Sequence, residues 1–72
     1  MEDAIINVVR EAQGDDPDVQ LRESELEALV IEAYPHLRPK PGQVGELVRY
    51  MNCEGKLRLL YAEGDVLVLR VP

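Results

Sequence analysis

The sequence predicts an α+β domain in which three helices come before a small antiparallel β-hairpin. Two observations predict it. Apolar residues recur at helical spacing in three segments of the first 55 residues. After Gly55 the spacing changes to the alternation that is typical of strands, on both sides of a short turn at residues 62–65. Because the chain has 72 residues, we expect one domain that covers residues 1–72.

The first helix is predicted from Asp3 to about Gln13. Its apolar face consists of Ile5, Val8, Val9 and Ala12. The carboxylate of Asp3 can cap the first free N–H groups, and Gly14 can end the helix in the left-handed conformation. Ile6 lies beside the apolar face, so the helix is either buried on two sides or uses Ile6 to contact another molecule.

The second helix is predicted to begin at Ser24, after a polar loop and a short strand at residues 19–21 that would pair with the hairpin. Ser24 and Glu27 have the spacing of a capping box, in which each side chain accepts the backbone N–H of the other residue. The apolar face of this helix is Leu26, Leu29, Val30 and Ala33. Pro35 ends the helix because the residue before a proline avoids the helical conformation. In the linker that follows, Leu37 is expected to enter the core.

The third helix is predicted to begin at Pro41, since the first helical position needs no N–H group, and to end at Gly55. Its apolar face is Val44, Leu47, Val48 and Met51. The opposite face consists of Gln43, Gly45, Glu46, Arg49, Tyr50 and Asn52. Amide and guanidinium groups on this face are of the kind that read base edges. Gly45 leaves a gap where another backbone could approach.

The hairpin at residues 56–71 has one apolar face that would cover the helices, formed by Leu57, Leu59, Tyr61, Leu67, Leu69 and Val71. The other face would show Arg58, Leu60, Val66, Val68 and Arg70. Three outward aliphatic residues are more than a small soluble monomer usually shows. Either the first helix or the N-terminus folds over them, or they form a dimer interface or a site for a protein partner. The candidate residues of that interface are Ile6, Leu60, Val66 and Val68.

The net charge of −6 is unevenly distributed. Residues 1–37 carry ten acidic and two basic side chains, whereas residues 38–60 carry two acidic and five basic side chains. The third helix and its flanks are therefore the only basic region. Such an asymmetry can orient a protein on a polyanion.

Several classes of protein are not expected. No apolar run approaches the ~20 residues that span a bilayer, and the N-terminus is acidic, so we expect a cytoplasmic protein without a membrane partner. One cysteine and one histidine exclude an internal disulfide and a zinc site within one chain, and residues 14–18 lack the EF-hand pattern. We expect no metal and no cofactor. An enzyme is not expected, because catalysis by Cys53 would require His36 beside it and so small a domain has little room for a cleft.

The segment from Gln43 to Arg58 resembles the recognition helix and the start of the wing in the winged helix-turn-helix superfamily, and residues 66–71 are similar to the returning wing strand. The resemblance covers roughly residues 3–72. It implies that the exposed side of the third helix meets double-stranded DNA. It implicates Gln43, Glu46, Arg49 and Tyr50, with Lys40, Lys56 and Arg58 as phosphate contacts.

Two functions follow as hypotheses. The first is a DNA-binding winged-helix protein that regulates transcription or the life cycle of a phage or plasmid. The second is a winged-helix module for protein–protein interaction, acting as a homodimer or adaptor without a nucleic-acid role. The acidic first half of the chain favours the second hypothesis. So does the acidic turn at residues 62–65, where DNA-binding wings usually carry Lys or Arg.

Overall fold

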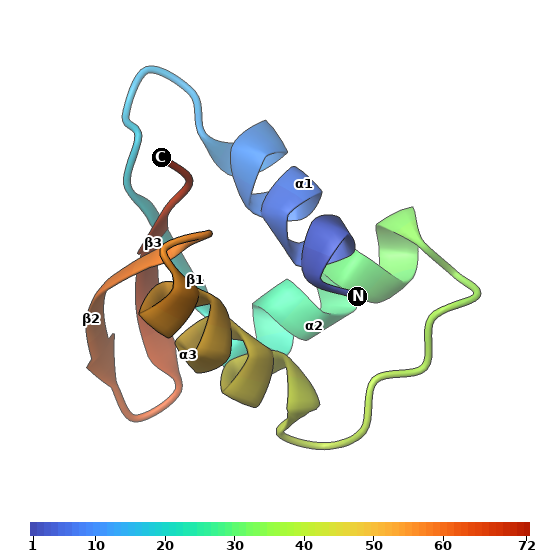
Figure 1. The fold of residues 1–72 in the computed structure, drawn as a ribbon. Coiled ribbons are helices and arrows are strands. Elements are labelled where there is room, and N and C mark those ends of the chain that lie inside the picture. The colour runs from blue at the N-terminus through green and yellow to red at the C-terminus, as the bar shows by residue number, and fades with distance from the viewer.

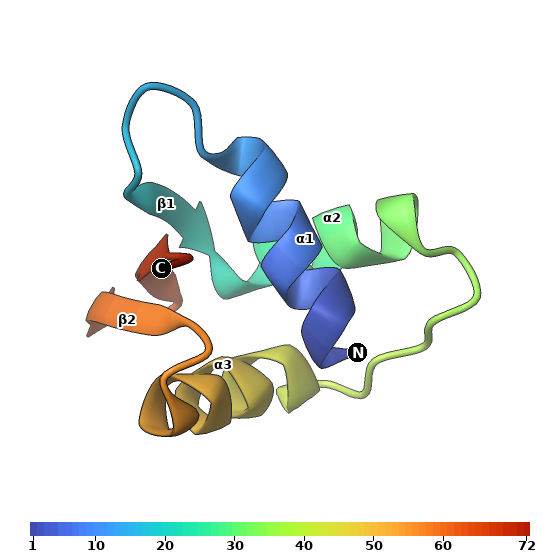
Figure 2. The same ribbon diagram turned by 45° about the horizontal axis from the view of Figure 1, so that its top comes forward.

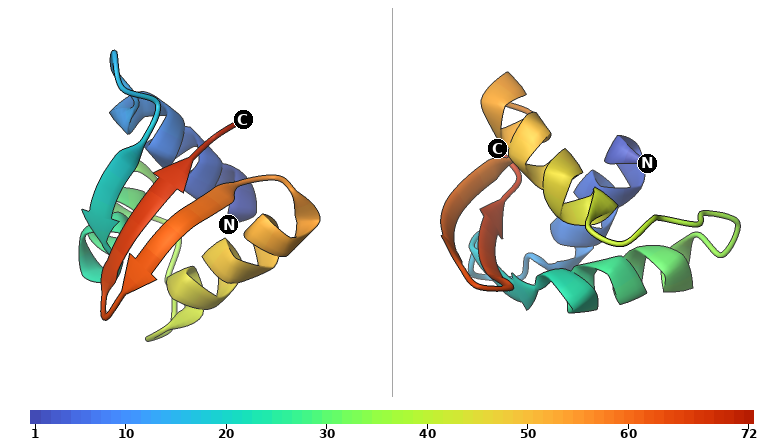
Figure 3. Two further views of the ribbon diagram at one scale, coloured as in Figure 1. Left: turned by 90° about the vertical axis from the view of Figure 1, so that its left-hand side faces the viewer. Right: turned by 90° about the horizontal axis from the view of Figure 1, so that it is seen from below.

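Three helices pack against one face of a three-stranded antiparallel sheet, in a computed structural model that describes residues 1–72 (Figure 1). The elements are, in chain order, α1 (Glu2–Ala12), β1 (Val19–Arg22), α2 (Glu23–Ala33), α3 (Gln43–Glu54), β2 (Arg58–Glu63) and β3 (Val66–Arg70). The predicted α+β class is confirmed, and the arrangement is compatible with a winged helix. Figure 3 shows all the helices on the same side of the sheet, so the other face of the sheet is uncovered.

The sheet has the strand order β1-β3-β2, which puts the returning strand of the hairpin in the middle. β1 pairs with β3 along its whole length, from Val19 opposite Leu69 to Arg22 opposite Val66. The strand predicted at residues 19–21 is therefore confirmed, and it extends the hairpin. Its side chains follow the hairpin pattern, with alternate residues turned toward the helices.

The pairing of β2 with β3 contains an irregularity that the sequence pattern did not predict. The register shifts between Leu59 and Tyr61, so that Tyr61 lies opposite Val68 and Leu60 is the extra residue. A β-bulge of this kind interrupts the two-residue period of a strand. Tyr61 is consequently on the outer face, where its side chain is 52% exposed. Its prediction as an inner residue is wrong because the bulge reverses the alternation that follows it.

Thirteen buried apolar side chains form one core between the helices and the sheet. Those with almost no exposure are Ile5, Val9, Leu26, Val30, Val44, Val48, Met51, Leu57, Leu67 and Leu69. Leu37 is half-buried and packs against this core, as expected from the sequence. Ala12 and Ala33, predicted as core residues, are exposed. Each is the last residue of its helix, and both line the open groove between α1 and α2.

The two ends of α1 differ from the prediction. The helix begins at Glu2, and no side chain caps it, so Asp3 lies within the first turn instead of in front of it. At the other end Gln13 leaves the helix in an extended conformation, and Gly14 has no positive φ. The chain therefore passes from α1 into the loop without the left-handed residue that the sequence predicts.

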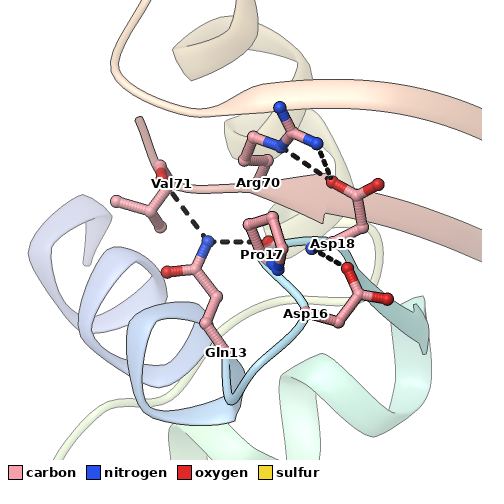
Figure 4. A network of polar contacts seen from close by, with 6 residues as sticks. All are labelled: Gln13, Asp16, Pro17, Asp18, Arg70 and Val71. Carbon is pink, nitrogen blue, oxygen red and sulfur yellow. Dashed lines mark hydrogen bonds and ion pairs between the residues drawn. The ribbon is translucent and has the colours of Figure 1, made fainter.

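That loop is fastened to the end of the sheet by polar contacts (Figure 4). The side-chain Nε2 of Gln13 donates to the carbonyl oxygens of Pro17, at 2.8 Å, and of Val71, at 3.4 Å. Asp18 Oδ1 accepts both Nε and Nη2 of Arg70, each at 2.7 Å. These contacts join the loop after α1 to the C-terminal end of β3.

The start of α2 is also earlier than predicted. Glu25 Oε1 accepts the backbone N–H of Arg22 at 3.0 Å, so the helix begins at Glu23 and the predicted box of Ser24 and Glu27 is wrong. The reason is that β1 runs directly into α2, and the pairing of Arg22 with β3 fixes where the strand stops.

α3 begins at Gln43 rather than at Pro41, because Gly42 precedes it in the left-handed conformation with a φ of 80°. The predicted C-terminal cap is confirmed: Gly55 has a φ of 80°. Figure 2 shows that α2 and α3 are joined by an irregular segment that runs around the outside of the molecule. This linker, residues 34–42, has nine residues, whereas the turn of a helix-turn-helix usually has 3–4.

Candidate nucleic-acid interface

The outward face of α3 is the surface on which the sequence places DNA contacts. The helix is anchored in the core by Val44, Val48 and Met51. On the opposite side Glu46, Arg49 and Tyr50 are exposed, and the Tyr50 side chain is 54% exposed. These residues are accessible to another molecule.

The N-terminal end of α3 is shaped by Gln43 and Lys40. Gln43 Oε1 accepts the backbone N–H of Lys40 at 2.9 Å, and the backbone N–H of Gln43 donates to the carbonyl oxygen of Lys40 at 3.0 Å. The amide oxygen of Gln43 therefore caps the turn, and its NH₂ group is left as the donor for a ligand. The Lys40 ammonium group is exposed and forms no ion pair.

Arg38 lies just before this turn and has no acidic partner. Its guanidinium group donates to the carbonyl oxygens of Pro35 and of Leu37, the latter at 3.1 Å. The sequence shows Arg38 only as one member of the basic segment. Its place close to the start of α3 in the chain, with its charge unpaired, adds it to the candidate phosphate contacts.

The middle of the helix departs from the prediction. Gly45 is buried, and a Cβ at this position would lie 2.4 Å from Glu23 Oε1. The gap beside Gly45 is thus filled by the Glu23 carboxylate of α2 and is closed to an approaching backbone. Arg49 Nη1 donates to the carbonyl oxygen of Gly45 at 3.1 Å, which folds the guanidinium group back along its own helix.

At the C-terminal end of α3 a cation that the sequence assigns to phosphate binding is already paired. Lys56 Nζ lies 3.1 Å from Glu2 Oε1 and 3.6 Å from Glu54 Oε2. The hydrogen bond to Glu2, together with the negative charges of Glu2 and Glu54, raises the pKa of the Lys56 ammonium group above its usual value. The two carboxylates outnumber the single ammonium group, so this cluster carries a net negative charge.

The neighbouring Tyr50 is part of the same cluster. A hydrogen bond to the Glu54 carboxylate, reinforced by its charge, raises the pKa of the Tyr50 hydroxyl. The same hydrogen bond is the main cause that lowers the pKa of Glu54, and Lys56 contributes to the lowering. Tyr50 is thus an exposed aromatic residue whose hydroxyl group interacts with the Glu54 carboxylate.

Arg58, the remaining predicted phosphate contact, is separated from α3. It is the first residue of β2 and lies opposite Arg70, on the uncovered face of the sheet. The structure therefore keeps Lys40, Gln43, Glu46, Arg49 and Tyr50 together on α3 and its N-terminal turn. The tip of the hairpin does not join them, because the backbone N–H of Glu23 donates to the carbonyl oxygen of Asp65 at 2.7 Å and holds the tip against α2.

The second surface that the sequence indicates is the uncovered face of the sheet. Leu60 is 42% exposed there, and Val66 and Val68 are half-buried. Tyr61 joins them because of the bulge, which no pattern in the sequence indicates. Ile6 does not: it lies on α1, in the helical layer, and is half-buried against the core.

The rest of the surface holds no constellation with evident chemistry. A shallow groove of about 400 Å³ between α1 and α2 is lined by Val8, Glu11, Ala12, Leu29, Glu32 and Ala33. His36 is exposed and packs edge-on against Tyr34, with ring centres 6.3 Å apart. Cys53 is exposed in the last turn of α3. No three His, Cys, Asp or Glu side chains are grouped so that they could hold a metal ion.

Comparison with known proteins finds no family model, no curated protein and no solved structure that matches this chain. None of the three helices has the length and apolar character that crossing a membrane requires.

Proposed function

We propose that this chain is a winged helix-turn-helix domain that contacts double-stranded DNA with the outward face of α3, as a regulator of transcription or of a phage or plasmid. One observation carries the proposal. Five of the eight basic residues have no acidic partner, and three of these five, Arg38, Lys40 and Arg49, lie on α3 or the segment just before it. Unpaired cations can replace the counterions of a phosphate backbone.

The order of the elements supports the proposal. Helix, strand, two helices and a hairpin, with the hairpin's second strand in the middle of the sheet, is the order expected of a winged helix. In such a fold the third helix is the one that enters the groove. The nine-residue linker before α3 and the fastened hairpin tip are departures from that pattern. They leave α3 as the main contact.

The side chains on and just before α3 suit two kinds of contact with DNA, to phosphates and to base edges. Lys40 and Arg38 would bind phosphates, whereas Arg49 can reach either a phosphate or the O6 and N7 acceptors of guanine. The free amide donor of Gln43 suits a base acceptor. Glu46 is repelled by phosphates but can accept the amino group of cytosine.

The test is fluorescence anisotropy of a labelled pool of random duplexes, titrated with the protein at several salt concentrations. Three phosphate contacts predict a slope of about −2.7 in log K against log salt. Arg49→Gln and Lys40→Gln should each reduce the magnitude of the slope by about 1. Arg10→Gln is the matched control, because Arg10 is an exposed, unpaired cation on α1.

Two outcomes would overturn the proposal. One is the absence of a complex at low salt. The other is a complex that Arg49→Gln and Arg10→Gln weaken equally, since this would mean that binding does not depend on α3. Circular dichroism of each variant separates a lost contact from a lost fold.

We also propose protein–protein interaction as a second function, on a different observation. The sheet has one face that no helix covers (Figure 3). Two large residues of β2, Leu60 and Tyr61, are exposed there. Exposed apolar patches of this kind mark contact surfaces. The test is the oligomeric state of the purified chain, with the design given in the next section.

A further inference from the structure

The uncovered sheet face has an apolar centre. The bulge puts Tyr61 opposite Val68 and leaves Leu60 as the extra residue next to it; Leu60 is 42% exposed and Tyr61 is 52% exposed. Val66 and Val68 are half-buried beside them on the central strand. The centre of the face therefore spans β2 and β3, and no other segment of the chain lies over it (Figure 3).

The charges around this centre are ordered along β2. Arg58 lies at one end of the strand and Glu63 at the other, with Leu60 and Tyr61 between them. The other charged side chains at this face are paired within the chain: Arg70 with Asp18 at 2.7 Å, and Arg22 with Asp65 at 3.8 Å. Arg58 and Glu63 are therefore the charged residues of this face that have no ion-pair partner.

We propose that a second copy of this chain covers the face, related to the first by a two-fold axis that lies between the two sheets and crosses β2 at Leu60 and Tyr61. This rotation lays β2 of one copy antiparallel over β2 of the other. Arg58 of each copy then faces Glu63 of the other, and the apolar centres are buried against each other. The partner in the protein–protein interaction proposed above is thus this chain itself.

Two other arrangements fit the face less well. A two-fold axis along the strands would stack Arg58 on Arg58 and Glu63 on Glu63, and like charges oppose such a contact. Edge-to-edge pairing of β2 is hindered because the bulge breaks the regular ladder. It is also hindered because Asn52 Oδ1 already accepts the backbone N–H of Leu59 at 3.0 Å.

The experiment uses charge reversal in sedimentation velocity, up to millimolar protein and without DNA, so that its outcome is independent of the α3 surface. The wild type should reach twice the monomer mass of 8.1 kDa. In a dimer of the Arg58→Glu variant, both facing pairs would consist of two acidic side chains. In a dimer of the Glu63→Arg variant, both facing pairs would consist of two basic side chains. Each variant alone should dimerise about tenfold more weakly or worse.

An equimolar mixture of Arg58→Glu and Glu63→Arg should restore the dimer. In the mixed dimer every facing pair is again of opposite charge. Val68→Glu should abolish the dimer, since Val68 lies at the centre of the face and away from the edge of the sheet. Arg10→Glu, on α1, is the matched control and should dimerise like the wild type. Circular dichroism verifies that each variant is folded.

A wild type that remains monomeric at millimolar concentration overturns the proposal. A mixture that does not recover the dimer overturns the antiparallel arrangement. A folded Val68→Glu variant that still dimerises overturns the face-to-face contact and indicates pairing through the strand edge. Because no DNA is present, none of these outcomes changes the test of the α3 surface.

Discussion

Lys56 shows how a tertiary contact can change the role that the sequence predicts for a residue. In the sequence it is a cation beside the third helix, whereas in the structure its ammonium group joins α1 to the end of α3 through Glu2 and Glu54. The pKa of Lys56 is raised in the folded state. Its contribution to stability is therefore present below a lysine's usual pKa of 10.5 and is lost as the pH rises through the folded value.

This sign gives a prediction for Lys56→Gln. The variant should melt slightly below the wild type at neutral pH, because the exposed pair is weak, and the difference should vanish at pH values well above 10.5. Lys40→Gln, which removes an unpaired cation, is the control and should show no such dependence. Thermal melts of the wild type and the two variants over a pH series measure these differences in melting temperature. If the melting temperature of Lys56→Gln differs from that of the wild type by the same amount at high pH, the ion pairs of Lys56 are not the cause of the difference.

Gly45 gives a second prediction at the level of the residue. Alanine is better than glycine in a helix by about 1 kcal/mol, but a Cβ here would meet the end of the Glu23 side chain at 2.4 Å. We expect Gly45→Ala to change the free energy of unfolding little in the wild type. In a Glu23→Ala background it should stabilise the fold by about 1 kcal/mol. Urea denaturation of the wild type, the two single variants and the double variant measures the coupling between the two positions. If Gly45→Ala lowers the free energy of unfolding in both backgrounds, the Glu23 side chain is not what opposes a Cβ at position 45.

At the level of the element, two glycines that follow helices differ in backbone conformation, although the sequence predicts the same role for both. Gly55 ends α3 in the left-handed conformation, with a φ of 80°, whereas Gly14 follows α1 without a positive φ. Open space surrounds both positions, so a methyl group would clash at neither. Only the backbone conformation distinguishes them.

We therefore expect opposite effects from the same substitution. Gly55→Ala should lower the free energy of unfolding by roughly 1–2 kcal/mol, the cost of a side chain in the left-handed region. Gly14→Ala should be neutral or stabilising by about 0.4–1 kcal/mol, because it restricts the unfolded chain. Chemical denaturation of the two variants under the same conditions provides the comparison. Equal losses in both would show that Gly14 also needs the freedom of glycine.

The bulge in β2 is the element-level feature with the largest effect on the surface. A single extra residue at Leu60 turns Tyr61 outward and puts Ala62 opposite the buried Leu67. Without it Tyr61 would lie over the core and the outer face would lose its aromatic side chain. Leu60, Tyr61 and Ala62 are three consecutive apolar residues, so this stretch has no alternation that shows which of them faces the core.

At the level of the whole molecule, one core carries the stability of the fold. A domain of this size is stabilised by about 4–11 kcal/mol in total. Leu67 is fully buried on the central strand, whereas Leu60 is largely outside the core. Leu67→Ala should cost about 2–5 kcal/mol, a large part of the total.

Leu60→Ala is the matched control for this prediction. It removes the same atoms from an exposed position, so the free energy of unfolding of the monomer should change by no more than about 0.5 kcal/mol. Denaturation at low protein concentration measures both variants without a contribution from self-association. A large loss in Leu60→Ala would mean that the uncovered face is packed within the monomer.

The class of fold, the number and approximate positions of the helices and strands, and most of the core could be predicted from the amino-acid sequence alone. This is because the periods of helices and strands are local properties, visible in Val44, Val48 and Met51 or in Leu67 and Leu69. The sequence also indicated the outward Leu60, Val66 and Val68.

The tertiary structure alone decided which charges are free and which way Tyr61 points. Glu2 and Lys56 are 54 residues apart in the chain, and Glu23 is 22 residues from the gap at Gly45, so no local pattern reveals either contact. The bulge is likewise fixed by how β2 pairs with a distant strand residue by residue. Electrostatic pairing and strand register depend on distances in space, and these exist only once the chain has folded.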